Sequence, residues 1–243
     1  TEYVKMLESL PNDLRQAWLE GNWNLFVGQY FTEWKEDIHV IEPFLIPSHW
    51  RRYFTMDYGL DMLAGYWIAL DENGKAYVYK EAYQSGLVMS KAAELIRSMT
   101  NEPIYAWYAP PDLWNRRQDT GRSVADAFAE YGIPLIKAQN NRAQGWLDMK
   151  EWLKPQTDKD GRLFANIQVF RNCTNLIRCI PALLYDSKNP DDVATEPHEY
   201  THGPDALRYF VAGRPTPARK PIEPDETYVA FEKQIDNFIS FGG

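Results

Sequence analysis

Short runs rich in apolar and aromatic residues recur between residues 51 and 83, where they predict strands. Three ranges follow this pattern, Arg51–Asp57, Ala64–Leu70 and Ala76–Tyr83. The last two are joined by Asp71-Glu72-Asn73-Gly74, and its Asn-Gly pair favours a tight hairpin because both residues tolerate a positive φ angle. The sequence therefore predicts an antiparallel meander of three strands.

Apolar positions take on helical spacing from residue 88 to Met99, and this pattern predicts a helix. A fourth strand follows Pro103 and ends near Tyr108, and a second helix runs from Val124 to Tyr131 before Gly132. Leu135–Ala138 gives a fifth strand. The order of three strands, helix, strand, helix, strand is that of the ribonuclease H fold. We therefore expect an α/β fold whose mixed sheet has helices on both faces.

Further elements follow this core pattern. Arg142–Leu153 is predicted as a helix, Leu163–Phe170 as one arm of a β-hairpin, and Cys173–Ile180 as a helix that ends near Pro181. The last core helix is expected from Pro204 to about Ala212, since proline suits the first helical position.

Three regions are predicted along the chain. Residues 1–48 form a helical, aromatic lead-in, and residues 49–213 form the α/β domain. Residues 214–243 are a proline-rich linker and a C-terminal amphipathic helix, and that helix is expected to dock on a partner or on its own domain. The chain begins with Thr1, which suggests a fragment of a longer protein.

Composition narrows the class of protein. Hydrophobic residues make up 44% of the 243 positions and nine are tryptophan, so the chain is a packed globular protein. No run of about 20 apolar residues and no signal-peptide pattern occurs, so no membrane contact is expected. The two cysteines have no zinc-site spacing, which fits a reducing cytoplasm.

The net charge of -8 argues against a protein whose whole surface binds nucleic acid, because phosphate binding needs clustered Lys and Arg. Local basic positions remain candidates for phosphate contacts. They are Arg116, Arg117, Arg122, Lys137 and Arg142.

Three aspartates occupy positions that suggest chemistry. Asp57 ends the first predicted strand, Asp112 follows the fourth, and Asp205 stands in the first turn of the last predicted core helix. Acids that converge from distant segments suit hard divalent cations such as Mg²⁺ or Mn²⁺, which prefer oxygen ligands. Each residue taken alone also fits a turn or helix-cap role. Asp191 and Asp192 are better explained as a solvated loop pair than as metal ligands.

An ordered set of motifs resembles the C-terminal nuclease domain of phage and prophage terminase large subunits. The motifs are Met56-Asp57-Tyr58-Gly59, Ala109-Pro110-Pro111-Asp112-Leu113-Trp114, Asn141-Arg142 with Gly145, and His202-Gly203-Pro204-Asp205-Ala206-Leu207-Arg208-Tyr209. The lead-in is similar to the segment that joins the ATPase and nuclease of that family, as in Leu19-Glu20-Gly21-Asn22-Trp23. The resemblance spans roughly residues 10 to 212. Two positions depart from the family pattern: Thr201 replaces an acid, and Asp112 stands slightly later in its loop.

The resemblance implies a metal-dependent endonuclease that cuts double-stranded viral DNA during genome packaging in the host cytoplasm. Two Mg²⁺ or Mn²⁺ ions would be held by Asp57, Asp112, Asp205 and His202, with Asp57 as the bridge. The implied partners are DNA, an ATPase domain on the same full-length chain, the small terminase subunit and the portal ring. No phosphate-loop motif occurs in these residues, so we expect no ATP hydrolysis by them.

Two alternatives remain open from the sequence. The same fold hosts resolvases and transposases, and fold alone does not separate these enzymes from a packaging nuclease. A non-catalytic portal or DNA docking module, with structural acids, is the second alternative. A different nuclease class would use a Glu-x-Lys motif on a hairpin, and Glu33-Trp34-Lys35 has these letters without the preceding strand aspartate.

Overall fold

The structure is a computed structural model that describes residues 28–218, except residues 60, 117, 119, 120 and 190. The predicted N-terminal helix and the predicted C-terminal amphipathic helix lie outside these residues, so both stay predictions. Within the described ranges, none of the helices has the length and apolar character that crossing a membrane requires.

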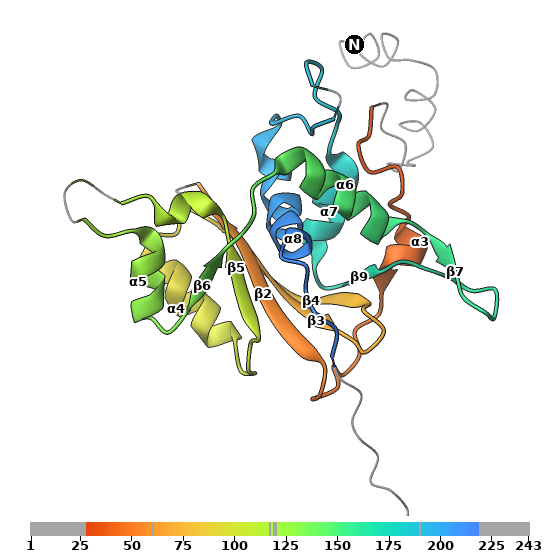
Figure 1. The fold of residues 1–243 in the computed structure, drawn as a ribbon, viewed down its shortest axis with the longest axis horizontal. Coiled ribbons are helices and arrows are strands. Elements are labelled where there is room, and N and C mark those ends of the chain that lie inside the picture. The colour runs from red at the N-terminus through yellow and green to blue at the C-terminus, as the bar shows by residue number, and fades with distance from the viewer. Residues whose placement is uncertain (1–27, 60, 117, 119–120, 190, 219–243) are drawn as a thin grey trace, which may run out of the picture.

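A seven-stranded mixed sheet runs through the middle of the molecule in the order β1-β9-β4-β3-β2-β5-β6 (Figure 1). Its strands are β1 (Val40–Ile41), β2 (Arg51–Tyr58), β3 (Met62–Leu70), β4 (Ala76–Ser85), β5 (Ala106–Ala109), β6 (Leu135–Lys137) and β9 (Ile167–Phe170). The pairs β2–β3 and β3–β4 are antiparallel, and the other pairs are parallel. The meander predicted from the sequence is therefore confirmed.

Helices cover both faces of this sheet (Figure 1). They are α3 (Glu36–His39), α4 (Met89–Met99), α5 (Val124–Glu130), α6 (Arg142–Leu153), α7 (Thr174–Ala182) and α8 (His202–Ala212), with the 3-10 turns η1 (Pro111–Trp114) and η2 (His198–Tyr200). One hydrophobic core lies between the sheet and α4 with α5, and the other between the sheet and α6, α7 and α8. This arrangement confirms the expected mixed sheet with helices on both faces.

Alternate residues of β2 serve the two cores, as the two-residue period of a strand requires. Phe54 and Met56 pack toward α4 and α5, whereas Tyr53 packs toward α8. The hydroxyl of Thr55 donates a 2.5 Å hydrogen bond to the carbonyl of Ala206 in α8. Asp57 shares the parity of Tyr53 and Thr55, so the strand places it on the α8 side.

The segment from residue 163 to 170 differs from its prediction as a single arm of a hairpin. β8 (Leu163–Phe164) pairs antiparallel with β7 (Gln156–Thr157), while β9 joins the main sheet between β4 and β1. Asn166 separates the two strands because its backbone is bonded elsewhere, its N–H to Trp152 and its carbonyl to Ala76. The two-residue strand β1, too short to show a period, was missed.

Acid should destabilise the fold through His39, which is buried beneath the C-terminal end of α6. The N–H of Lys35 donates to Nδ1 of His39, and Nε2 lies 2.7 Å from the carbonyl of Leu153. Burial lowers the pKa of His39, although the nearby carbonyls oppose this shift. Between the unfolded pKa of about 6.5 and the lower folded pKa, the unfolded chain binds more protons. Stability is therefore retained above that window and lost as the pH falls through it.

Urea unfolding measured from about pH 7 to pH 5 tests this expectation. His39→Gln should flatten the decline in the free energy of unfolding relative to the unmodified chain. An equal pH slope in the two proteins would contradict the assignment.

Candidate active site

A histidine bridges two carboxylates at the end of β2. Nδ1 of His202 lies 2.8 Å from Oδ2 of Asp57, and Nε2 lies 3.2 Å from Oδ2 of Asp61. Asp57 belongs to β2, Asp61 to the β2–β3 turn, and His202 to the first turn of α8. Burial acts to lower the pKa of His202, but its bond with Asp57 and the charges of both aspartates raise it above the usual histidine value.

Glycine lets α8 approach the sheet closely enough for this contact. A Cβ atom on Gly203 would lie 2.7 Å from the hydroxyl oxygen of Tyr66 on β3, a distance that side chains do not tolerate. The next residues, Pro204 and Asp205, continue the helix, and the Asp205 N–H donates to the carbonyl of Thr201. The helix thus begins at His202, two residues before the predicted start. Both His202 and Asp205 lie in its first turn.

Asp205 is held by a buried arginine one turn further along α8. Nε and Nη2 of Arg208 donate to Oδ1 of Asp205 at 2.9 and 2.7 Å. Both bonds end on Oδ1, so Oδ2 lies outside this ion pair. Burial raises the pKa of Asp205 despite the opposing charges of Arg208 and Arg142, and the charge of Asp57 adds to the rise. Asp57 and Asp205 are therefore close enough to repel each other.

Asp112 reaches the same neighbourhood from η1, where its side chain is exposed. Burial raises the pKa of Tyr209, and the charges of Asp57, Asp205 and Asp112 raise it further. All three aspartates predicted from the sequence thus act electrostatically on one phenol. The N-cap of η1 is Pro110 and Asp112 is the second residue of the turn, so Asp112 does not hold the cap position considered for it.

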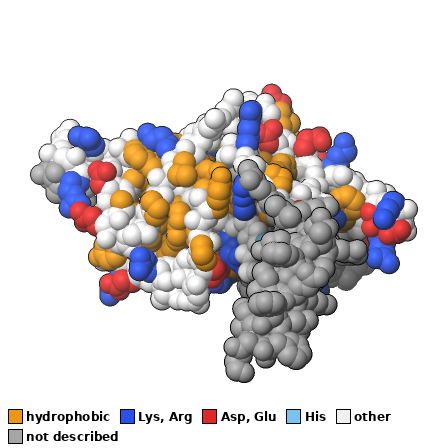
Figure 2. All heavy atoms as spheres, turned by 60° about the horizontal axis from the view of Figure 1, so that its bottom comes forward, with side chains coloured by type: hydrophobic (Ala, Val, Ile, Leu, Met, Phe, Trp, Pro, Cys, Tyr) orange, Lys and Arg blue, Asp and Glu red, His pale blue; other side chains and the backbone are white. Residues whose placement is uncertain are grey.

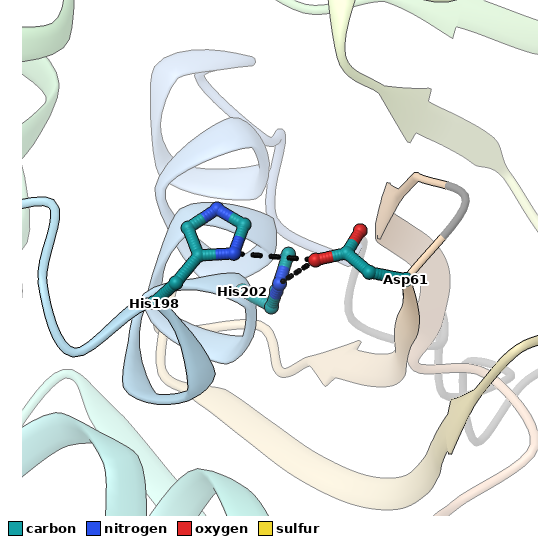
Figure 3. Close-up of side chains that lie close together, drawn as sticks. All are labelled: Asp61, His198 and His202. Carbon is teal, nitrogen blue, oxygen red and sulfur yellow. Dashed lines mark hydrogen bonds and ion pairs between the residues drawn. The ribbon is translucent and has the colours of Figure 1, made fainter.

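A tight cluster of potential metal ligands lies beside these aspartates and shares none of them. Among the residues that the structure describes, the trio of potential metal ligands within 4.8 Å of one another is Asp61, His198 and His202 (Figure 3). Unneutralised carboxylates repel one another, and two ions about 4 Å apart also need a wider ligand set than one ion does. Asp57, Asp112 and Asp205 do not form such a trio among the described residues, so their role as joint ligands stays a prediction.

Sequence reasoning missed Asp61 and His198. His198 and His202 are four residues apart, and His-x3-His is a ligand spacing found in zinc sites, so this signal was present in the sequence. Asp61 gave no comparable signal, because its partners lie 137 and 141 residues further along the chain.

The basic residues predicted to contact phosphate differ in their surroundings. Arg142 lies 3.3 Å from Asp192 through Nε and against the ring of Trp146. Nζ of Lys137 lies 5.5 Å from the ring centroid of Trp114, which belongs to η1 as Asp112 does. Arg116 is exposed and acts on Asp126 of α5, and Arg117 is outside the described residues. Arg142 and Lys137 are thus the basic candidates with the clearest ties to the aspartate neighbourhood.

Asp191 and Asp192 have different surroundings. Oδ1 of Asp192 accepts a 2.9 Å hydrogen bond from the indole of Trp146 and also lies next to Arg142. Asp191 is exposed. Asp192 therefore fixes the loop on α6, a structural role that the solvated-pair interpretation did not anticipate.

Charged side chains are mixed on the face that lies at the bottom of Figure 1. Figure 2 shows Lys and Arg interspersed with Asp and Glu around the margin, while hydrophobic side chains gather on the left. The described basic residues form no broad single-sign patch in this view. Such a surface fits the net charge of -8.

The fold is similar to that of large terminases. A large terminase from a thermophilic bacteriophage aligns with a TM-score of 0.60 at 20% identity, over 78% of this chain and 46% of the other. The P22 large terminase nuclease domain aligns with a TM-score of 0.59 at 19% identity, over 77% of this chain and 92% of the other. The large terminase nuclease from thermophilic phage G20c gives 0.50 at 10% identity, over 77% and 98%.

These alignments confirm the ribonuclease H-like fold expected from the sequence, and they confirm its likeness to terminase nuclease domains. The chain spans about half the length of the large terminase aligned first. No protein-family model and no curated protein sequence matches the chain.

Proposed function

We propose that this chain is a metal-dependent endonuclease that cleaves double-stranded viral DNA during genome packaging. The observation that supports the proposal most is the pairing of Asp57 with His202 at the end of β2, one helical turn from Asp205. The fold shared with terminase nuclease domains supports the same reaction class. The side chains of the site carry the assignment, because the fold alone does not determine the chemistry.

The donor set fits Mg²⁺ or Mn²⁺. Asp57, Asp112 and Asp205 offer carboxylate oxygens, which hard cations prefer, and Oδ2 of Asp205 lies outside the Arg208 ion pair. A pair of such ions supplies the polarisation of water and phosphate that phosphodiester hydrolysis needs. Asp57, Asp112 and Asp205 would hold these ions, with Asp57 placed between the other two assignments.

His202 has two possible roles beside Asp57. Its Nδ1 faces the carboxylate at 2.8 Å, so it can ligate an ion or donate and accept a proton there. Arg208 keeps Asp205 oriented, since two bonds from one guanidinium fix the plane of the carboxylate. Arg142 and Lys137 are the proposed phosphate contacts, together with Arg116 and Arg117.

The negative net charge bears on how DNA would reach the site. A chain with net charge -8 and scattered basic residues has little attraction for DNA of its own. We therefore assign delivery of DNA to an ATPase domain on the same full-length chain, with the small terminase subunit and the portal ring as further partners. The setting would be the cytoplasm of the host.

Cleavage of supercoiled plasmid by the purified 243-residue chain tests the proposal. We expect nicked and linear DNA with Mn²⁺ or Mg²⁺ and intact plasmid with EDTA. Asp112→Asn should remove most of the activity and leave the fold unchanged, because this side chain is exposed. Full activity of Asp112→Asn would contradict its assignment. Intact plasmid under every metal condition would instead favour the non-catalytic docking module.

A further inference from the structure

The side chains of Asp61, His198 and His202 converge on one point beside the candidate active site (Figure 3). Nδ1 of His198 and Nε2 of His202 each lie 3.2 Å from the same oxygen, Oδ2 of Asp61. Asp61 lies in the β2–β3 turn, His198 in η2 and His202 in the first turn of α8. Asp61 and His198 have no part in the Mg²⁺ or Mn²⁺ site assigned above, and His202 is the residue that the two sites would share.

The spacing of these atoms matches a tetrahedral ion. Zinc binds imidazole nitrogen and carboxylate oxygen at about 2.0–2.1 Å, so neighbouring ligand atoms in a tetrahedron lie roughly 3.3–3.4 Å apart. The two observed nitrogen–oxygen distances of 3.2 Å are close to this value, and all three ligand atoms lie within 4.8 Å of one another. An ion at this point would have three protein ligands and a free position for water.

His202 is oriented as metal-bound histidines usually are. Such residues bind the metal through one ring nitrogen and donate the N–H of the other to a carboxylate or carbonyl group. Here Nε2 faces Asp61 and His198, while Nδ1 lies 2.8 Å from Asp57. Asp57 is thus the carboxylate that accepts the N–H of Nδ1 and fixes the tautomer of His202.

We propose that Asp61, His198 and His202 form a second metal site, which binds a borderline divalent transition ion such as Zn²⁺. Two imidazoles and one carboxylate suit zinc, whereas Mg²⁺ prefers an octahedron of oxygen atoms. The site ties η2 and the β2–β3 turn to α8. It also gives His202 a single role toward the nuclease centre, because an ion on Nε2 leaves the proton on Nδ1, where it is donated to Asp57. The ion-binding claim itself does not rest on the nuclease proposal.

Calorimetric titration of the chelator-treated chain with ZnCl₂ tests this site. We expect one zinc ion per chain, and millimolar Mg²⁺ should not displace it. His198→Gln and Asp61→Asn should each weaken zinc binding at least about 100-fold, the upper end of what loss of an outer-shell partner costs. Both side chains are 57% exposed, so neither substitution disturbs a core.

The control variant is Asp112→Asn, which should lose Mn²⁺-dependent cleavage yet bind zinc as the unmodified chain does. Zinc should also raise the midpoint of thermal unfolding in the unmodified chain and in Asp112→Asn, but not in His198→Gln. Absence of zinc binding, or unchanged affinity in His198→Gln, would overturn the proposal. Loss of zinc binding in Asp112→Asn would overturn it as well, because the ion would then belong to the aspartate site.

Discussion

Replacing Asp57 with asparagine should reduce Mn²⁺-dependent plasmid cleavage by about three orders of magnitude or more. The amide keeps the shape of the side chain but removes the negative charge that would bridge two cations. Metal ions stabilise transition-state charge by several kcal/mol, and each 1.36 kcal/mol is about a factor of ten in rate. Initial rates at saturating Mn²⁺, with unfolding followed by circular dichroism, measure the effect.

Asp160→Asn is the matched control for this substitution. It removes the same charge from an exposed position in the β7–β8 turn, so cleavage should stay within about twofold of the unmodified rate. If Asp57→Asn cleaved DNA at the rate of Asp160→Asn, Asp57 would have no part in the reaction.

Replacing Arg208 with methionine should lower the free energy of unfolding by about 3 kcal/mol, because it leaves a carboxylate that is only 16% exposed without its partner. The side chain of Arg208 is 2% exposed, and it holds Asp205 through two hydrogen bonds. The freed carboxyl group can take up a proton instead of staying charged. We therefore expect the loss to be smaller in acid than at neutral pH.

A double substitution separates the charge from the packing. Asp205→Asn added to Arg208→Met removes the unpaired charge and should recover part of the lost stability in chemical denaturation. Arg178→Met, on the exposed face of α7, is the control and should change stability by less than about 1 kcal/mol. A loss below that limit in Arg208→Met would show that the ion pair contributes little to folding.

Regular periodicity explains which elements the sequence could predict. Strands β2, β3 and β4 are runs of eight to ten residues rich in apolar and aromatic side chains, and α4 repeats its apolar positions over three turns, so each leaves a local pattern. β1 has two residues and leaves none. The place of β9 depends on hydrogen bonds to β4 and β1, distant segments that no local pattern identifies.

The sequence likewise predicted some residues of the candidate site and missed others. Asp57 and Asp205 stood out because each lies at the end of a predictable element. The contact between Asp57 and His202 joins positions 145 residues apart and depends on how α8 packs on β3, which involves the small size of Gly203. Asp61 and His198 sit in turns, where spacing alone does not reveal which side chains meet.

The division of β2 between two cores constrains how its length can change. Inserting or deleting one residue between Arg51 and Met56 would turn every later side chain to the opposite face. Asp57 would then point toward α5, where Tyr58 now packs against Phe128, and Met56 would point toward α8. A change of two residues would preserve both faces. Viable length variants of this strand should therefore differ in steps of two, and a single-codon insertion should be more damaging than a double one.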